Sequence, residues 1–156
     1  SLNIGMLGHS MGGGITQNVL VVRPDLVKAA VLYAPVSSDA RENLEQYFLR
    51  NPARATTVQE IYDRHGSPEE NPSFWDGISP KTYFYRVKAP VKIFIGTDDE
   101  STPPRWSEDI SAQLDSLDKE VDMVVFEGEK HEFIPQWTAF MEESAGFFNM
   151  YLRESD

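Results

Sequence analysis

Seven residues near the beginning of the sequence, "GHSMGGG" (residues 8–14), constrain the fold more than any other segment. They contain four glycines and one serine, and they follow the apolar stretch "LNIGML", which is typical of a short buried strand. The residues that follow predict a helix over residues 10–22, with Met11, Ile15, Val19 and Val22 on one face. The serine is therefore expected at a sharp turn between a strand and a helix.

This segment contains a G-x-S-x-G motif centred on Ser10. Between a strand and a helix, such a turn has a strained backbone and lifts the serine hydroxyl clear of the sheet. We expect Gly8 and Gly12 to be small because the turn brings them close to neighbouring strands. The N–H of Met11, at the N-terminus of the helix, would point at an oxyanion formed when Ser10 attacks a carbonyl group.

The rest of the chain alternates apolar runs with helical patterns, which favours an α/β fold with a parallel sheet and crossover helices. Strands are predicted over residues 27–36, 89–96 and 121–128. A helix that ends near residue 117 is expected to be capped by Thr102, with Pro103 or Pro104 in its first turn. A final amphipathic helix is predicted over residues 136–152.

Residues 39–86 interrupt the alternation, and we interpret them as a lid inserted into the sheet domain. Short helices are predicted over residues 40–50 and 57–65, the second opened by a capping box of Thr57 and Glu60. Three prolines, two glycines and a Phe-Trp pair in residues 66–80 then indicate a structured loop. The expected organisation is a core of residues 1–38 and 87–156 with a helical lid over residues 39–86.

Two groups that could activate Ser10 follow the third and fourth predicted strands. "GTDDES" offers Asp98, Asp99 and Glu100, and "GEKHEF" offers His131. A serine hydroxyl needs a base, and the base needs an orienting carboxylate, in the chain order Ser, Asp, His. Because parallel strands end at one edge of a sheet, these groups are expected to lie together. The residues alone leave both Asp98 and Asp99 open as the acid.

The sequence resembles the C-terminal part of an α/β-hydrolase over nearly its whole length. It is most similar to carboxylesterases and prolyl-oligopeptidase-like hydrolases, whose "HG-x-x-D-x-x-V-P" and "G-x-x-H" stretches match "IGTDDESTPP" and "EGEKHEF". In the family pattern the acid lies three residues after a glycine, which selects Asp99 when counted from Gly96. The resemblance therefore implies that Ser10 is the nucleophile, His131 the general base and acid, and Asp99 the orienting carboxylate.

The resemblance also implies that part of the fold is missing from this sequence. In the family, several strands precede the elbow strand, and the loop after one of them donates the second oxyanion-hole N–H. The elbow strand is therefore expected at an open edge of about half a sheet. Three explanations are open: a missing N-terminal segment of a longer protein, pairing of the edge with another copy or chain, or a short hydrolase with a substitute donor.

Charge and residue content exclude several other functions. The chain has 25 acidic and 14 basic residues, a net charge of −11 that argues against nucleic-acid binding. It has no cysteine, and Pro135 occupies the place of the second histidine of a zinc motif that begins at His131. No metal or cofactor is therefore expected. No apolar run is long enough for a membrane span, and the absence of a visible secretory signal favours the cytoplasm.

These observations predict a serine hydrolase that cleaves small-molecule carboxylic esters through an acyl-enzyme. A prolyl-oligopeptidase-like peptidase or amidase is the alternative, because the sequence does not reveal how much protonation the leaving group needs. A hydrolase-like fragment that binds partners without catalysis is the alternative from another class. Candidate substrate contacts are His9, Phe74, Trp75 and Trp137, although packing is the simpler interpretation for each.

Overall fold

The computed structural model describes residues 3–153 and contains a four-stranded parallel sheet. Its strands lie in chain order: β1 (Gly5–His9), β2 (Ala29–Tyr33), β3 (Val91–Gly96) and β4 (Val121–Phe126). The register places Leu7 opposite Val31 and Phe94 opposite Val124. All four carboxyl ends therefore meet at one edge, and the predicted α/β class is confirmed.

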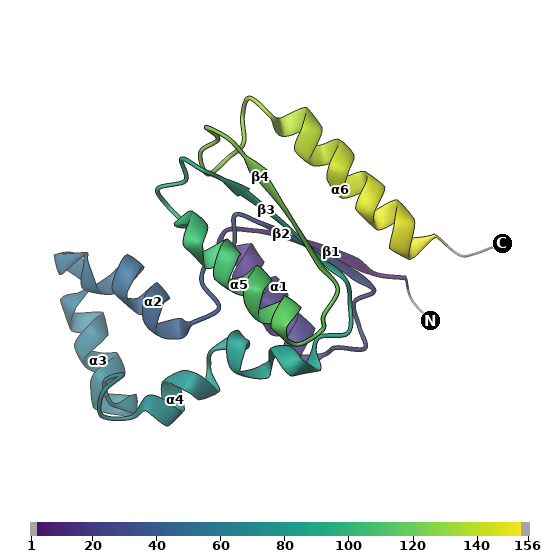
Figure 1. Ribbon diagram of the computed structural model, residues 1–156. Helices are drawn as coiled ribbons and strands as arrows, with labels where there is room; N and C mark the ends of the chain where they lie inside the picture. The colour runs from purple at the N-terminus through teal and green to yellow at the C-terminus, as the bar shows by residue number, and fades with distance from the viewer. Residues whose placement is uncertain (1–2, 154–156) are drawn as a thin grey trace.

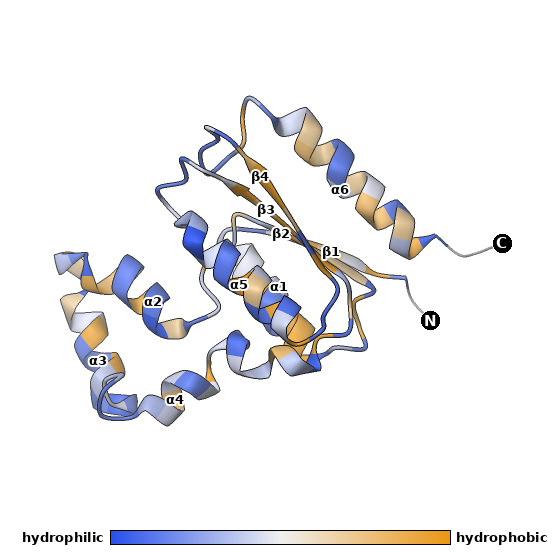
Figure 2. Ribbon diagram, viewed as in Figure 1, coloured by the Kyte–Doolittle hydropathy of each residue, from blue (hydrophilic) through white to orange (hydrophobic). Residues whose placement is uncertain are grey.

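Helices cover both faces of the sheet (Figure 1). Two of them, α1 (Met11–Val22) and α5 (Pro104–Ser116), lie on one face, and α6 (Trp137–Leu152) lies on the other. Because both faces are covered, β2 and β3 are buried along their whole length, and the strands are among the most hydrophobic segments of the chain (Figure 2). No helix in residues 3–153 combines the length and apolar character needed to cross a membrane.

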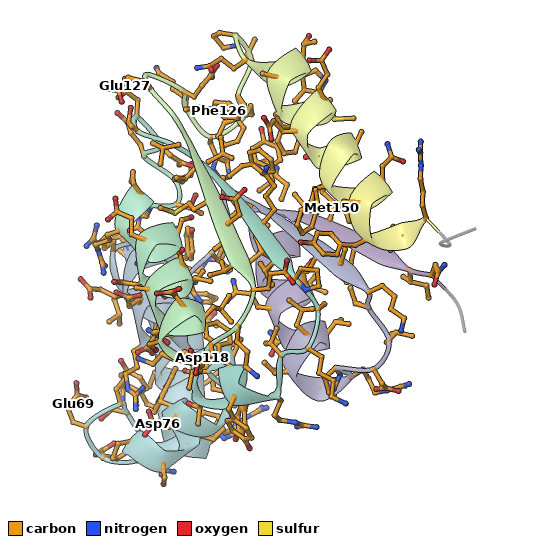
Figure 3. The ribbon with its side chains drawn as sticks, turned by 45° about the vertical axis from the view of Figure 1, so that its right-hand side comes forward. Glu69, Asp76, Asp118, Phe126, Glu127 and Met150 are labelled. Atoms are coloured by element: carbon orange, nitrogen blue, oxygen red, sulfur yellow. The ribbon has the colours of Figure 1, made fainter. Side chains whose placement is uncertain are left out.

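The core consists of one apolar cluster on each face of the sheet. On the face of α1 and α5 it is largely aliphatic and includes Leu20, Leu32, Ile93 and Ile110. On the face of α6 it is rich in aromatic rings: Tyr33, Phe94, Phe126, Phe133, Phe140 and Phe147. Figure 3 shows Phe126 at the end of β4, on the side of α6, with Glu127 at the turn beyond it.

The apolar face predicted for α1 is not the face that packs on the sheet. Met11 and Val22 are 72% and 62% exposed, and Ile15 is also exposed. Smaller and polar residues face the sheet instead, and a Cβ on Gly13 would lie 2.7 Å from the side chain of Pro35. The spacing of large apolar residues misidentified the buried face, because the first turn of the helix comes too close to Pro35 for a large side chain at Gly13. The buried residues are Gly13, Thr16, Gln17, Leu20 and Val21.

Residues 40–86 form a series of short helices beside the sheet (Figure 1). They are α2 (Ala40–Leu44), the π-helical turn η1 (Glu45–Leu49), the 3₁₀ turn η2 (Pro52–Arg54), α3 (Ala55–His65), α4 (Pro72–Gly77) and the 3₁₀ helix η3 (Pro80–Arg86).

Three details of this segment differ from the sequence prediction. Thr57 and Glu60 lie inside α3, which begins earlier and has no side-chain cap. Part of the predicted loop is α4, whose N-cap side chain, Asn71, accepts a backbone hydrogen bond and is followed by a proline, a recognised helix-start pattern. Phe84 of η3 is part of the core, so the packed core includes residues before position 87. That residues 39–86 act as a lid stays a prediction.

Candidate active site

The G-x-S-x-G motif forms the turn between β1 and α1. Ser10 has φ 56° and ψ −118°, a strained conformation for a residue with a side chain. Its N–H donates to the carbonyl of Tyr33 (2.9 Å), and its carbonyl accepts from the N–H groups of Gly13 (2.9 Å) and Val36 (3.2 Å). These bonds hold Ser10 at the carboxyl edge of the sheet.

Gly8 is the glycine on which this turn depends. A Cβ at Gly8 would lie 2.1 Å from the carbonyl oxygen of Gly12 and 2.4 Å from Thr16 Oγ1, so no side chain fits there. A Cβ at Gly12 would meet no atom of the described residues within 4 Å. The expectation that Gly12 is small because of a neighbouring strand is therefore not met within residues 3–153. The close approach in this turn is that of the Gly12 carbonyl to Gly8, and it does not involve the position of a Cβ at Gly12.

A hydrogen bond joins His131 to Asp99. His131 Nδ1 lies 2.8 Å from Asp99 Oδ2, and the Asp99 side chain is fully buried. Asp98 is exposed, and its carboxylate accepts from the hydroxyl of Thr97 (3.3 Å). Of the two adjacent acids, the structure therefore brings Asp99 to His131. A carboxylate at Nδ1 selects one tautomer of the imidazole and leaves Nε2 available to take a proton.

Four hydrogen bonds hold the Asp99 carboxylate. Oδ1 accepts from the N–H groups of Ser101 and Thr102, and Oδ2 accepts from the Thr102 hydroxyl and from His131, all at 2.8 Å. Burial acts to raise the pKa of Asp99, but the hydrogen bonds from His131 and Thr102 outweigh it and bring the pKa below its ordinary value. Asp99 is therefore ionised at neutral pH.

The place of Thr102 corrects a prediction. The sequence predicts a helix cap, but α5 begins at Pro104, has Pro103 at its N-cap and receives no side-chain cap. The buried Thr102 hydroxyl bonds instead to Asp99. The signal was present in the sequence, because an aspartate followed by hydroxyl residues two and three positions later commonly accepts their N–H groups in a turn.

His9 lies against His131. Its Nε2 is 3.0 Å from the main-chain oxygen of His131, to which it donates in the tautomer with the proton on Nε2. The two imidazole rings are 4.5 Å apart, and the His9 ring stacks on Tyr33 at 4.0 Å. Burial lowers the pKa of His9, so the ring is neutral at neutral pH. The half-exposed Trp137 borders the same aromatic group, 6.3 Å from Tyr33.

Ser10 directly follows His9, whose ring contacts His131. Within residues 3–153 no hydrogen bond joins Ser10 Oγ to His131, whose side-chain bonds are with Asp99 and Thr102. In serine hydrolases without substrate this contact is often long and tightens on binding. Met11 is the first residue of α1, where a backbone N–H has no acceptor within the helix and is available to a ligand.

The loop that carries His131 is held against the loop that carries Asp99. The N–H of Asp98 donates to the carbonyl of Glu129 (3.0 Å), and a Cβ at Gly96 would lie 2.2 Å from that same oxygen. The Glu129 side chain is 2% exposed and accepts from the N–H of Gln136, directly before α6. Sequence reasoning did not single out Glu129, and no local pattern in the sequence marks it as buried.

Phe74 and Trp75 are not brought to this site. Both lie on α4. Asp76 of this helix is at the opposite end of the molecule from Glu127, which precedes His131 by four residues (Figure 3). The Trp75 indole is buried and donates to the carbonyl of Gly66. Their contacts are thus with their own segment, and a role in substrate binding stays a prediction for them, as it does for His9 and Trp137.

The sequence model of the prolyl oligopeptidase family matches residues 1–154, almost the whole chain.

Solved structures are similar over the same length. An acylaminoacyl peptidase of Pyrococcus horikoshii matches 99% of the chain with a TM-score of 0.77 and 22% identity. A puromycin-hydrolyzing peptidase of Mycobacterium tuberculosis matches 97% (TM-score 0.75, 24% identity), and dipeptidyl peptidase 4 of Porphyromonas gingivalis matches 94% (TM-score 0.72, 19% identity). These likenesses confirm the α/β-hydrolase fold. The chain spans only 24%, 22% and 19% of those three proteins, respectively.

Proposed function

The chain belongs to the prolyl oligopeptidase family, and from this premise we propose that it carries the catalytic groups of a serine hydrolase that cleaves peptide or amide bonds. The observation that carries the proposal is the hydrogen bond between His131 and the buried Asp99 carboxylate, together with the strained turn of Ser10. An ionised carboxylate at Nδ1 stabilises the imidazolium that forms when His131 accepts the serine proton.

In the proposed reaction, Ser10 Oγ bonds to the scissile carbonyl carbon while its proton passes to His131 Nε2. The electron pair of the carbonyl π bond moves to the oxygen, and the N–H of Met11 donates to this oxyanion. His131 then gives its proton to the leaving amine, the C–N bond breaks, and an acyl-Ser10 ester remains. Water attacks this ester with His131 again as the base, which releases the acid and restores Ser10.

We place peptide and amide bonds ahead of the carboxylic esters that the sequence motifs favoured. The family and the similar structures named above are peptidases. This supports the peptidase or amidase function that the sequence analysis gave as the alternative. An amine leaves only when it is protonated, whereas an alkoxide leaves more readily, so a site that cleaves amides also cleaves activated esters. Ester turnover by itself therefore does not separate the two substrate classes.

We also propose that another strand of the same protein covers the open edge of β1. The carbonyl of Ile4 and the N–H of Ser10 bond toward β2, so alternation directs the N–H of Leu7 to the other side. Leu7 is 43% exposed, and Met11, at the start of α1, is more exposed still. The much greater length of the similar proteins supports this proposal. The family resemblance implies that the loop after one of the strands preceding β1 supplies the second donor to the oxyanion.

A fluorophosphonate probe on the full-length protein tests the proposed activity. We expect one adduct, on Ser10, which Ser10→Ala abolishes and which Ser116→Ala, a change at an exposed serine of α5, leaves intact. A peptide anilide and a p-nitrophenyl ester are then compared as substrates. Absence of the adduct from the folded protein would contradict the proposal and favour a non-catalytic binding role. If the adduct forms and the protein turns over the ester but not the anilide, the result would favour the carboxylesterase function predicted from the sequence.

A further inference from the structure

The hydroxyl of Thr102 lies where the hydrogen bonds of Asp99 and His131 meet. Thr102 Oγ1 is 2.8 Å from Asp99 Oδ2, 3.2 Å from the carbonyl oxygen of Ala34 and 3.4 Å from His131 Nδ1. The residue is completely buried, so water does not compete for these contacts. The reaction described above does not use this hydroxyl.

A hydroxyl has one proton and donates to only one of the two oxygens within reach. Asp99 Oδ2 is both the nearer acceptor and the charged one, and hydrogen bonds to a charged acceptor are the stronger. The hydroxyl proton of Thr102 therefore points to Asp99, and the contact of this hydroxyl with the carbonyl oxygen of Ala34 is the weaker of the two. The same Oδ2 accepts from His131, so two donors share one oxygen.

We propose that Thr102 is a positioning residue that limits how strongly Asp99 holds a proton on His131. An oxygen whose charge is divided between two donors attracts an imidazolium less than an undivided one does. The carboxylate cannot turn to offer its other oxygen, because Oδ1 already accepts from the N–H groups of Ser101 and Thr102. This proposal rests on the proposed function, in which His131 must release its proton in every turnover.

Other ionisable side chains lie around the Asp99–His131 pair on β1, β2, η1 and the loop after β4. They are unchanged by a substitution at Thr102, so a comparison of variants isolates the hydroxyl. These side chains are His9, Tyr33, Tyr47, Glu129 and Glu132.

Thr102→Val removes the hydroxyl and keeps the shape of the side chain, and Thr102→Ser keeps the hydroxyl as the matched control. The rate of fluorophosphonate labelling of Ser10 is measured against pH in the full-length protein. In this pH profile the labelling rate falls on the acid side, and we expect Thr102→Val to move the midpoint of that fall upward by ~0.5 pH unit. This shift is equivalent to a rise of about threefold in the proton affinity of the base. Thr102→Ser should stay close to the parent. The ring signals of His131 in a nuclear magnetic resonance titration should move in the same direction.

A downward shift in Thr102→Val would overturn the proposal, since the hydroxyl would then accept from His131 Nδ1 and donate to Ala34. An unchanged midpoint would overturn it as well and leave Thr102 with a packing role. If the parent protein is not labelled, the proposed function fails, while the titration of His131 still decides the inference about Thr102. If circular dichroism shows that Thr102→Val does not fold, Thr102→Ala replaces it, and its shift is interpreted in the same way.

Discussion

The Nε2 atom of His9 lies 3.0 Å from the main-chain oxygen of His131, although the two residues are 122 positions apart in the sequence. The bond connects the end of β1 to the loop after β4, and β1 and β4 are the two edge strands of the described sheet. Tyr33, at the end of β2, stacks on the His9 ring. The residue before the proposed nucleophile therefore holds the backbone of the proposed general base.

His9→Phe should keep the aromatic stacking on Tyr33 and lose the hydrogen bond to His131. We expect the rate of fluorophosphonate labelling of Ser10 to fall about 3- to 10-fold, the equivalent of one neutral hydrogen bond. His9→Gln retains a donor and should recover part of the rate. If both variants label like the parent, His9 has no part in holding His131.

Asp99→Asn should reduce turnover of the best substrate by about 10³- to 10⁴-fold, because an amide cannot stabilise the imidazolium and favours the wrong tautomer of His131. Asp98→Asn is the matched control, since Asp98 is exposed and, within residues 3–153, its side chain bonds only to the neighbouring Thr97. It should keep nearly full activity. The reverse result would assign the orienting role to Asp98.

Gly8→Ala should destabilise the protein by about 1–3 kcal/mol or more, because the new methyl group collides with the backbone of Gly12. Gly146→Ala is the contrasting change, at an exposed position of α6 where a Cβ meets no described atom within 4 Å. It should stabilise the protein by about 0.5–1 kcal/mol, since alanine loses less backbone entropy in a helix. Urea unfolding measures both effects, and a tolerated Gly8→Ala would contradict the tight turn.

Stability should decrease with falling pH partly because of His9. Burial lowers the pKa of His9 below its ordinary value of 6.5, so in mildly acidic solution the unfolded chain binds more protons than the folded one. The free energy of unfolding therefore falls as pH drops below that value. Measured by urea unfolding at about pH 7 and about pH 5, the loss should be smaller in His9→Phe than in the parent. Equal losses would show that His9 does not contribute.

Asp99 adds a loss at lower pH. Its pKa lies below the ordinary value of 3.8, so the stabilisation that it gives is complete above that value and disappears as pH falls through the folded-state pKa. Asp99→Asn should remove this part of the acid unfolding transition, and Asp98→Asn should not.

Hydrogen exchange tests the proposed cover of the β1 edge. If a further strand pairs with β1 in the full-length protein, the N–H of Leu7 should exchange as slowly as that of Met6, which faces β2. Fast exchange at Leu7 with slow exchange at Met6 would show that the edge is open.

Much of the fold was predictable because it depends on local patterns. The four strands, the helices after them and the parallel arrangement follow from apolar runs and helical periodicity. The buried face of α1 was not predictable in this way, because Gly13 and Thr16 pack where the larger Met11 and Ile15 were expected. The helix α4 was missed because the prolines and glycines of residues 66–80 were taken as loop signals, although Asn71 and Pro72 also form a helix start.

By itself, the sequence determined the sharp turn at Ser10 and the candidates Asp98, Asp99 and His131, since these follow from motif spacing at the ends of strands. The family resemblance already favoured Asp99 over Asp98, and the structure places Asp99 against His131. Only the tertiary structure decided that Thr102 shares this carboxylate and that His9 holds the base. The reason is physical: a hydrogen bond needs atoms within about 3 Å of each other, and the folded sheet edge alone sets such distances between residues far apart in the chain.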